Sequence, residues 1–265
     1  SLFIGLAVPS GVVFLRFYMD DNIKDKGHLE SLTDIPVIGV IGHNSKESNL
    51  VVPNHPKSLI SEGFRSIRTN LQYLGSKTNK NQIILVNSVV GSEGKSFTSV
   101  NLGAVLALTN QKVVLLGLDL RKPRLHLEFG GDNDVGISNY LVGNASAGNV
   151  IKPTGIDNLS FIASGPTPPN PSELILNDYM PALLKELQEQ FDYIILDSPP
   201  FGLVTDASIL MGYADLNLFV LRQDYSKEAY VQSIEDLRQD MQFRNIYLLL
   251  NDLRVDRSRY GYGYG

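Results

Sequence analysis

The chain has 265 residues, of which 43% are hydrophobic and 19% charged, and its net charge at pH 7 is −5. This length predicts one large or two small globular domains, and the acidic balance gives no sign of a nucleic-acid partner. The sequence contains no cysteine, which excludes disulfides and thiolate metal sites. None of the four histidines lies at the spacing of metal ligands, so a zinc site is not expected.

Residues 1–18 are mostly apolar and include one charged residue, Arg16. A helix over its sixteen residues Leu2 to Phe17 would be about 24 Å long, which is short of the roughly 30 Å hydrocarbon core of a bilayer. We therefore expect the end of a transmembrane helix of a longer protein; a signal-peptide core or a buried helix is the alternative. The basic residues Arg16, Lys24 and Lys26 favour a cytoplasmic exit.

Residues 19–56 are polar with short apolar pieces, so we expect a juxtamembrane connector with one small strand or turn. Between Ser58 and Leu74 the apolar residues recur at helical spacing, which predicts an amphipathic helix. Glu62, Arg65 and Arg68 are spaced by three and share one stripe of this helix. The stripe is either a solvated charged face or a self-association surface, in which Glu62 of one subunit meets arginines of the next.

The motif around which the chain is organised begins with a β-branched apolar run, residues 83–86. A polar loop with two glycines follows, and then an apolar helical segment over residues 97–108. Strand, loop and helix are the context of a Walker A phosphate loop, although Val89 stands where the first glycine belongs. The loop N–H groups and the helix dipole would bind phosphate. The candidate nucleotide-binding residues are Gly91, Ser92, Glu93, Gly94, Lys95, Ser96 and Phe97.

Two further predicted strands end in aspartate. Residues 112–120 carry Asp119 near their end, followed closely by Arg121 and Arg124, and residues 193–197 end in Asp197 before Ser-Pro-Pro. The second pattern has the form of a Walker B motif. We therefore expect Ser96, Asp119 and Asp197 to hold Mg²⁺, with the two arginines offering charge to phosphate oxygens.

Alternating strands and helices continue to residue 250. The patterns predict strands over residues 159–163, 216–221 and 246–250, and helices over residues 134–143, 180–190 and 226–240, with another beginning at Pro171. This alternation predicts an α/β fold, a mostly parallel sheet with helices on both faces and a ligand site at the carboxyl ends of the strands. Asn251 would lie at that edge, where its amide could contact an adenine, although an ordinary loop asparagine is as good an explanation.

Residues 254–265 alternate tyrosine with glycine at their end. Such a segment cannot bury a core, and we expect a flexible tail. Tyr260, Tyr262 and Tyr264 would then be available to an enzyme or a partner, unless the tail has no role.

In combination, these motifs resemble those of the bacterial tyrosine kinases, P-loop kinases tied to capsule and exopolysaccharide export. The resemblance covers nearly the whole chain, and the apolar start resembles the fused form, in which a polysaccharide chain-length regulator continues into the kinase. The matching segments are Glu62, Arg65 and Arg68 for the oligomerisation motif, Gly94 to Ser96 for Walker A, Asp119 to Pro123 for Walker A′, Asp197 to Pro200 for Walker B, and Tyr260, Tyr262 and Tyr264 for the tyrosine cluster.

The resemblance implies a P-loop tyrosine kinase domain over residues 57–253 that uses ATP and Mg²⁺. It would phosphorylate its own tail in trans within an oligomer and so regulate exopolysaccharide synthesis and export. Catalytic roles are implied for Lys95, Asp119, Asp197 and Arg121. The implied partners are other copies of the chain in a ring, the bacterial inner membrane through residues 1–18, a tyrosine phosphatase and the polysaccharide export machinery. The kinase domain would lie on the cytoplasmic face of that membrane.

The sequence departs from the family pattern at Gly117, where the first of two Walker A′ aspartates is usual. That aspartate is a candidate catalytic base, so the base remains unassigned. The departure keeps an alternative from another class open: an ATP-dependent assembly scaffold similar to the partition ATPases. The lysine that those ATPases have within the loop is replaced by Val90, and a scaffold has no need of clustered tyrosines.

Overall fold

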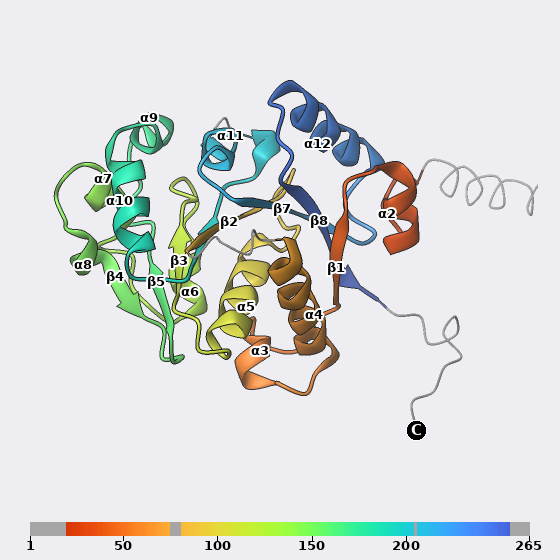
Figure 1. Cartoon of the computed structure of the whole chain (residues 1–265), viewed down its shortest axis with the longest axis horizontal. Helices are drawn as coiled ribbons and strands as arrows, with labels where there is room; N and C mark the ends of the chain where they lie inside the picture. Colours follow the sequence, from red (N-terminus) through yellow and green to blue (C-terminus); the bar gives the residue numbers. More distant parts are fainter. Residues whose placement is uncertain (1–19, 75–80, 204–205, 255–265) are drawn as a thin grey trace, which may run out of the picture.

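The computed structural model describes residues 20–74, 81–203 and 206–254, and these residues form one α/β unit around a single sheet (Figure 1). The eight strands are in the order β1-β8-β7-β2-β6-β3-β5-β4. All neighbours are parallel except β4 and β5, which confirms the predicted mostly parallel sheet. The strands are β1 (Val37–Gly42), β2 (Gln82–Asn87), β3 (Val113–Gly117), β4 (Ile151–Pro153), β5 (Leu159–Ile162), β6 (Tyr193–Asp197), β7 (Leu216–Arg222) and β8 (Ile246–Leu253).

Helices cover both faces of this sheet (Figure 1). One face carries α3 (Val51–Asn54), α4 (Leu59–Leu74), α5 (Lys95–Ala107) and α6 (Leu125–Glu128). The other carries α2 (Lys26–Leu32), α7 (Ile137–Leu141), α8 (Ala147–Val150), α9 (Pro171–Ile175), α10 (Tyr179–Gln188), α11 (Asp206–Met211) and α12 (Glu228–Asp240). A 3-10 turn, η1 (Phe201–Leu203), follows β6. The sheet therefore separates two hydrophobic cores.

The central strand β2 shows how the sequence produces these two cores. Ile83 and Leu85 are buried in one core, and Ile84 and Val86 in the other, because successive side chains of a strand point to opposite faces. A strand that is buried on both faces reads as a continuous apolar run, which is the pattern of this segment. Its carboxyl end therefore delivers the next residues to the middle of one sheet edge.

Residues 20–56 differ from the expected connector, because they belong to the same folded unit as the rest. Strand β1 pairs in parallel with β8 at the sheet edge, and Ile23, Leu29 and Ile41 are fully buried. The pairing joins segments about 200 residues apart in the sequence, so no local pattern in the polar stretch could indicate it. The predicted boundary at residue 57 therefore does not separate two units.

Two expectations fall outside the described residues: the transmembrane helix over residues 1–18 and the tail with Tyr260, Tyr262 and Tyr264. Within residues 20–74, 81–203 and 206–254, no helix combines the length and apolarity needed to cross a membrane.

Candidate active site

A cavity of about 540 Å³ lies at the carboxyl ends of β2, β3 and β6. Its wall from the phosphate loop consists of Gly91, Ser92, Gly94, Lys95, Ser96 and Phe97. The remaining wall consists of Asp119, Arg121, Lys122 and Arg124 after β3, Asp197 to Pro200 after β6, and Asn49 and Glu128. The cavity therefore brings together most of the residues that the sequence predicts for nucleotide and metal binding.

The phosphate loop has a backbone that requires glycine at one position. Gly94 has a φ of +101°, and a Cβ atom there would lie 2.0 Å from Nδ2 of Asn251. Helix α5 begins at the next residue, Lys95, and its body is buried, so the loop delivers a helix N-terminus to the cavity wall. A helix N-terminus with free N–H groups favours an anion.

Lys95 is half-buried in this wall, and its Nζ donates to Oγ of Ser88 at 2.9 Å. Burial lowers the pKa of Lys95, while the charges of Asp197, Asp119 and Glu93 act in the opposite direction. The ammonium group is thus surrounded by carboxylates in a partly desolvated place. A phosphate group in the cavity would meet this positive charge at low solvent screening.

Asp197 is the most buried acid of the cavity, with 3% of its surface exposed. Its carboxylate accepts hydrogen bonds from the hydroxyls of Ser96 at 2.7 Å and Ser99 at 3.2 Å. Burial raises the pKa of Asp197 to about 6, although both hydroxyls and Lys95 favour the charged form. The predicted pair of Ser96 and Asp197 is therefore in direct contact.

Asp119 lies two residues beyond the end of β3 and is less buried than Asp197. Its Oδ1 accepts the backbone N–H of Lys122 at 2.9 Å, which fixes the carboxylate at the start of the following turn. Arg121 lines the same wall, and its Nη2 donates to the hydroxyl of Ser172 at 3.2 Å. The segment after β3 therefore adds both basic side chains and a carboxylate to the cavity wall.

The oxygen atoms of Ser96, Asp119 and Asp197 form a donor set that suits Mg²⁺. Mg²⁺ prefers hard oxygen ligands, and in nucleotide sites it takes few of them from protein and the rest from water and phosphate. Within the described segments, no cluster of three or more His, Cys, Asp or Glu residues could hold a metal alone. A cation here would accordingly depend on the nucleotide for part of its ligands.

Gly117 lies opposite Asp197 in the register of β3 and β6. A Cβ atom at this position would lie 3.0 Å from Oγ of Ser164, which itself donates to the carbonyl oxygen of Gly117 at 2.7 Å. The space beside Gly117 is thus taken by the Ser164 hydroxyl. The carboxylates that line the cavity in the described part of the chain are Asp119, Asp197 and Glu128.

Glu93 and Asn251 do not line the cavity but lie behind the loop. The Glu93 carboxylate accepts the N–H of Val90 at 2.9 Å and the hydroxyl of Ser226, and burial raises its pKa. Asn251 donates its amide to the carbonyl oxygen of Glu93 at 2.9 Å. Their side chains therefore shape the loop, and the Asn251 amide is already engaged where an adenine contact was an expectation.

The charged stripe of α4 does not line the cavity. Arg65 pairs with Glu62 of the same helix and donates to the carbonyl oxygen of Pro56 at 2.6 Å. Arg68 donates to the carbonyl oxygen of Val105 at 3.3 Å, near the end of α5. Glu62 keeps 63% of its side-chain surface exposed and could exchange its partner.

Sequence reasoning missed several residues of the site. Glu128 and Asn49 meet at the cavity edge, where the Asn49 amide donates to the Glu128 carboxylate at 3.1 Å.

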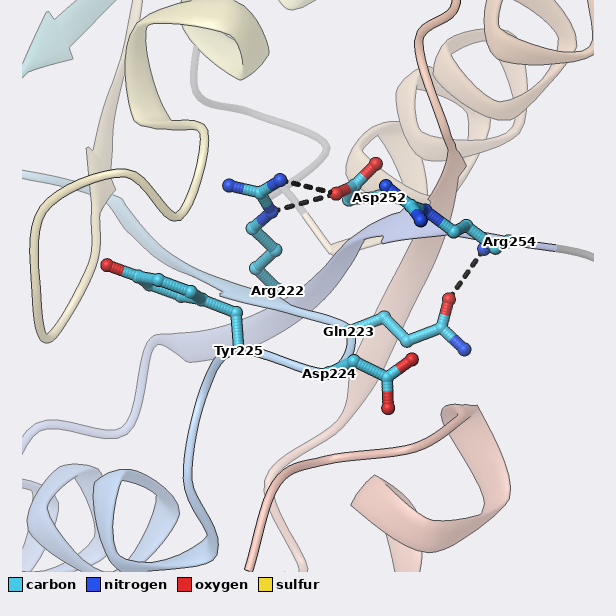
Figure 2. A pocket seen from close by; sticks show the side chains of 6 residues that line it. All are labelled: Arg222, Gln223, Asp224, Tyr225, Asp252 and Arg254. Carbon is cyan, nitrogen blue, oxygen red and sulfur yellow. Dashed lines mark hydrogen bonds and ion pairs between the residues drawn. The ribbon is translucent and has the colours of Figure 1, made fainter. Parts of the chain in front are cut away.

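A second hollow of about 230 Å³ lies at the ends of β7 and β8 (Figure 2). In it, Nε and Nη2 of Arg222 each lie 2.8 Å from Oδ2 of Asp252, and the guanidinium lies 5.4 Å from the centre of the Tyr225 ring. No motif marks these residues, since they meet only through the fold.

Comparison with known proteins finds relatives that are named tyrosine-protein kinases. The family model described as an AAA domain matches residues 81–245. The tyrosine-protein kinase YwqD of Bacillus subtilis is 32% identical over 82% of this chain and 91% of its own length. The tyrosine-protein kinase ptk of Acinetobacter johnsonii is 30% identical over 99% of this chain, which spans 37% of that longer protein.

Among solved structures, the kinase domain of the Escherichia coli tyrosine kinase ETK aligns with a TM-score of 0.80 and 30% identity. The alignment covers 91% of this chain and 98% of that domain. The phosphate loop, the Ser96–Asp197 pair and Asp119 thus lie on a fold that this chain shares with proteins named tyrosine-protein kinases. The chain belongs to the bacterial tyrosine-protein kinase family.

Proposed function

We propose that the chain binds ATP with Mg²⁺ in the cavity and transfers the terminal phosphoryl group to tyrosines of its own tail. The observation that carries this proposal is the meeting of Lys95, the Ser96–Asp197 pair and Asp119 around one cavity of about 540 Å³. The phosphate loop supplies N–H donors, and Lys95 supplies a positive charge in a half-buried place. Bound Mg²⁺ would supply charge neutralisation at the phosphate oxygens.

The described residues have separate roles in this proposal. Ser96, Asp119 and Asp197 hold the cation, and Gly91 to Phe97 surround the phosphates. Arg121, which lines the same cavity, neutralises charge that develops on the transferred group. The tyrosine oxygen forms a bond to phosphorus as the bond to the ADP oxygen breaks. The hydroxyl proton passes to a carboxylate of the cavity, for which Asp119 is the more exposed of the two aspartates. A loose transition state needs little help from a base.

The transfer is proposed to occur in trans within an oligomer, most simply a ring. Glu62, Arg65 and Arg68 would form the contact between copies if Glu62 exchanged its own Arg65 for an arginine of the next subunit. Each phosphate adds roughly −1.5 to −2 charges, so three on one tail would repel each other and the acidic body of the protein. Phosphorylation would then loosen the assembly and allow it to cycle.

Residues 1–18 would anchor the kinase domain to the cytoplasmic face of the bacterial inner membrane. The cycle of assembly would regulate capsular or exopolysaccharide synthesis and export, with a tyrosine phosphatase resetting the tail and the export machinery as partner. This setting is supported by the resemblance of the motifs and by the greater length of relatives such as ptk.

The direct test is intact-mass measurement with fragmentation after incubation of the chain with Mg-ATP. We expect additions of about 80 Da per phosphate on Tyr260, Tyr262 or Tyr264, because these phenols are the acceptors. A variant with all three tyrosines replaced by phenylalanine should receive no phosphate on the tail. If ATP is bound or hydrolysed without any transfer to tyrosine, the result would favour the ATP-dependent assembly scaffold. That alternative is open because Gly117 stands where the family has an aspartate.

Transfer in trans gives a second expected result. Replacing Glu62, Arg65 and Arg68 together with alanine should abolish tail phosphorylation of a Lys95→Met copy by an active copy, because the two no longer associate. Phosphate incorporation into a labelled Lys95→Met copy measures the transfer, and sedimentation measures the association of the copies. Arg238→Ala, which removes another arginine paired three residues away on α12, is the matched control and should leave transfer unchanged. Full transfer by a proven monomer would contradict the proposed contact.

A further inference from the structure

Three consecutive carbonyl oxygens of the phosphate loop accept hydrogen bonds from side chains at the ends of β7 and β8. The Tyr225 hydroxyl donates to Gly91 at 3.0 Å, and Nη1 of Arg222 donates to Ser92 at 3.1 Å. The Asn251 amide donates to Glu93 at 2.9 Å. Arg222 ends β7, Tyr225 lies in the turn that follows it, and Asn251 belongs to β8; none of these three residues lines the larger cavity. Three side chains thus hold three successive carbonyl oxygens of the loop, those of residues 91–93.

The carbonyl direction decides where the N–H groups of the loop point. In a planar trans peptide the C=O and the following N–H point in opposite directions. Holding the carbonyl oxygens of residues 91–93 against β7 and β8 therefore turns the N–H groups of residues 92–94 away from those strands. Ser92 and Gly94 have φ of +66° and +101°, so the backbone turns sharply within the same three residues. Successive N–H groups arranged around such a turn form a concavity that binds anions.

The donors themselves are fixed in place. Arg222 is held by Asp252 through two nitrogens at 2.8 Å, as Figure 2 shows. Its guanidinium also lies over the Tyr225 ring, 5.4 Å from the ring centre. Asn251 is 7% exposed and lies directly against Gly94. Glu93 adds a fourth fixed point, because its buried carboxylate holds the N–H of Val90 at 2.9 Å. The loop therefore has little freedom to turn its carbonyl oxygens toward a phosphate.

We propose that Arg222, Tyr225 and Asn251 are positioning residues that preorganise the phosphate loop for a polyphosphate chain. Without these donors the loop could rotate its peptides, and each rotation would replace an N–H donor by a carbonyl that repels phosphate. Preorganised donors bind more tightly because no ordering cost is left for the binding step. The inference rests on the proposed function only in that the loop binds nucleotide phosphates; it does not depend on transfer to tyrosine.

The test is calorimetric titration of the whole chain with inorganic tripolyphosphate, ATP and adenosine, each with Mg²⁺. Tyr225→Phe removes only the hydroxyl that holds Gly91 and keeps the ring against Arg222. We expect it to weaken tripolyphosphate and ATP roughly fivefold each, the loss typical of one neutral hydrogen bond. Adenosine affinity should not change. Asn251→Ala should act in the same sense on the carbonyl oxygen of Glu93.

Tyr73→Phe is the matched control, because Tyr73 is 83% exposed on α4 and does not line the cavity. It should leave all three titrations unchanged. Unchanged tripolyphosphate affinity in Tyr225→Phe would overturn the proposal, as would a loss confined to ATP and adenosine, which would make Tyr225 a contact of the base. Normal polyphosphate binding without tyrosine transfer would contradict the proposed function alone.

Discussion

Lys95→Met should lower tyrosine phosphorylation by at least about 100-fold, the scale on which removal of one preorganised donor to a transition state reduces a rate. The Nζ atom of Lys95 is the one lysine charge at the head of α5, held by Ser88 at 2.9 Å beside the carboxylates of the cavity. Methionine keeps the length and apolar stem of the side chain and removes only the charge. The measurement is the rate of phosphate incorporation at saturating Mg-ATP, with the thermal midpoint as a check of folding.

Lys122→Met gives the matched control for this result. Lys122 lines the same cavity and carries the same charge, but it is exposed and its described contact is a backbone hydrogen bond to Asp119. Because solvent screens an exposed charge, its loss should cost much less than the loss of Lys95. Equal losses in the two variants would mean that the cavity responds to net charge alone, and the assigned role of Lys95 would be wrong.

Asp197→Asn should reduce transfer by a factor of about 100 to 1,000 and leave the unliganded protein at least as stable as before at pH 7.5. The two effects have opposite signs because the charge of Asp197 is needed by a cation but is costly in the empty, buried site. Asparagine has nearly the same shape and cannot ionise. Incorporation assays and thermal unfolding measure the two effects, and Asp178→Asn, an exposed aspartate, controls for the chemistry of the substitution.

The pH dependence follows from the direction of the shift. The pKa of Asp197 is raised from 3.8 to about 6, so the folded protein binds this proton more tightly than the unfolded chain does. The contribution of Asp197 to stability is therefore unfavourable above pH 6, by about 3 kcal/mol, and it disappears as the pH falls from 6 toward 4. Asp197→Asn should remove this dependence.

Binding of Mg-nucleotide should show the opposite trend. A proton and a cation compete for the same carboxylate, so affinity should fall up to tenfold per pH unit below about 6 in the unchanged protein. In Asp197→Asn the affinity should be low and nearly flat across this range. A pH profile of the variant that retains the same slope would assign the titration to another group and contradict the role of Asp197.

The parts of the site that could be predicted from the sequence are those that produce a recognisable pattern of neighbouring residues. Ile83 to Val86 is a continuous apolar run because β2 is buried on both faces, and the loop and α5 follow it without a gap. Strand-end aspartates such as Asp197 could be found for the same reason. The core face of α4 was equally visible, since Phe64, Ile67 and Leu71 recur at helical spacing and are all buried.

The parts that could not be predicted depend on long-range contacts. Tyr225 and Arg222 precede a helix in a stretch without any motif, and their contact with Gly91 and Ser92 joins positions more than 120 residues apart. Asn251 was visible as a strand-end residue, but its role was not, because only the fold shows that Gly94 occupies the place beside its amide. Small elements such as α3 and β4 have too few residues for a period to be detected.

The place of β1 at the edge of the sheet has a consequence for any shortened form of the protein. Strand β8 has β7 on one side and β1 on the other, and Gly39 of β1 packs its backbone closely against Ile67 and Leu249. A truncation that starts at the Walker A segment, or at the helix before it, would leave the backbone of β8 unpaired along one side. Open, apolar strand edges pair with other chains and lead to aggregation. A shortened form that keeps the sheet intact should therefore begin before Ile23. A form that begins at Ser58 would lack β1.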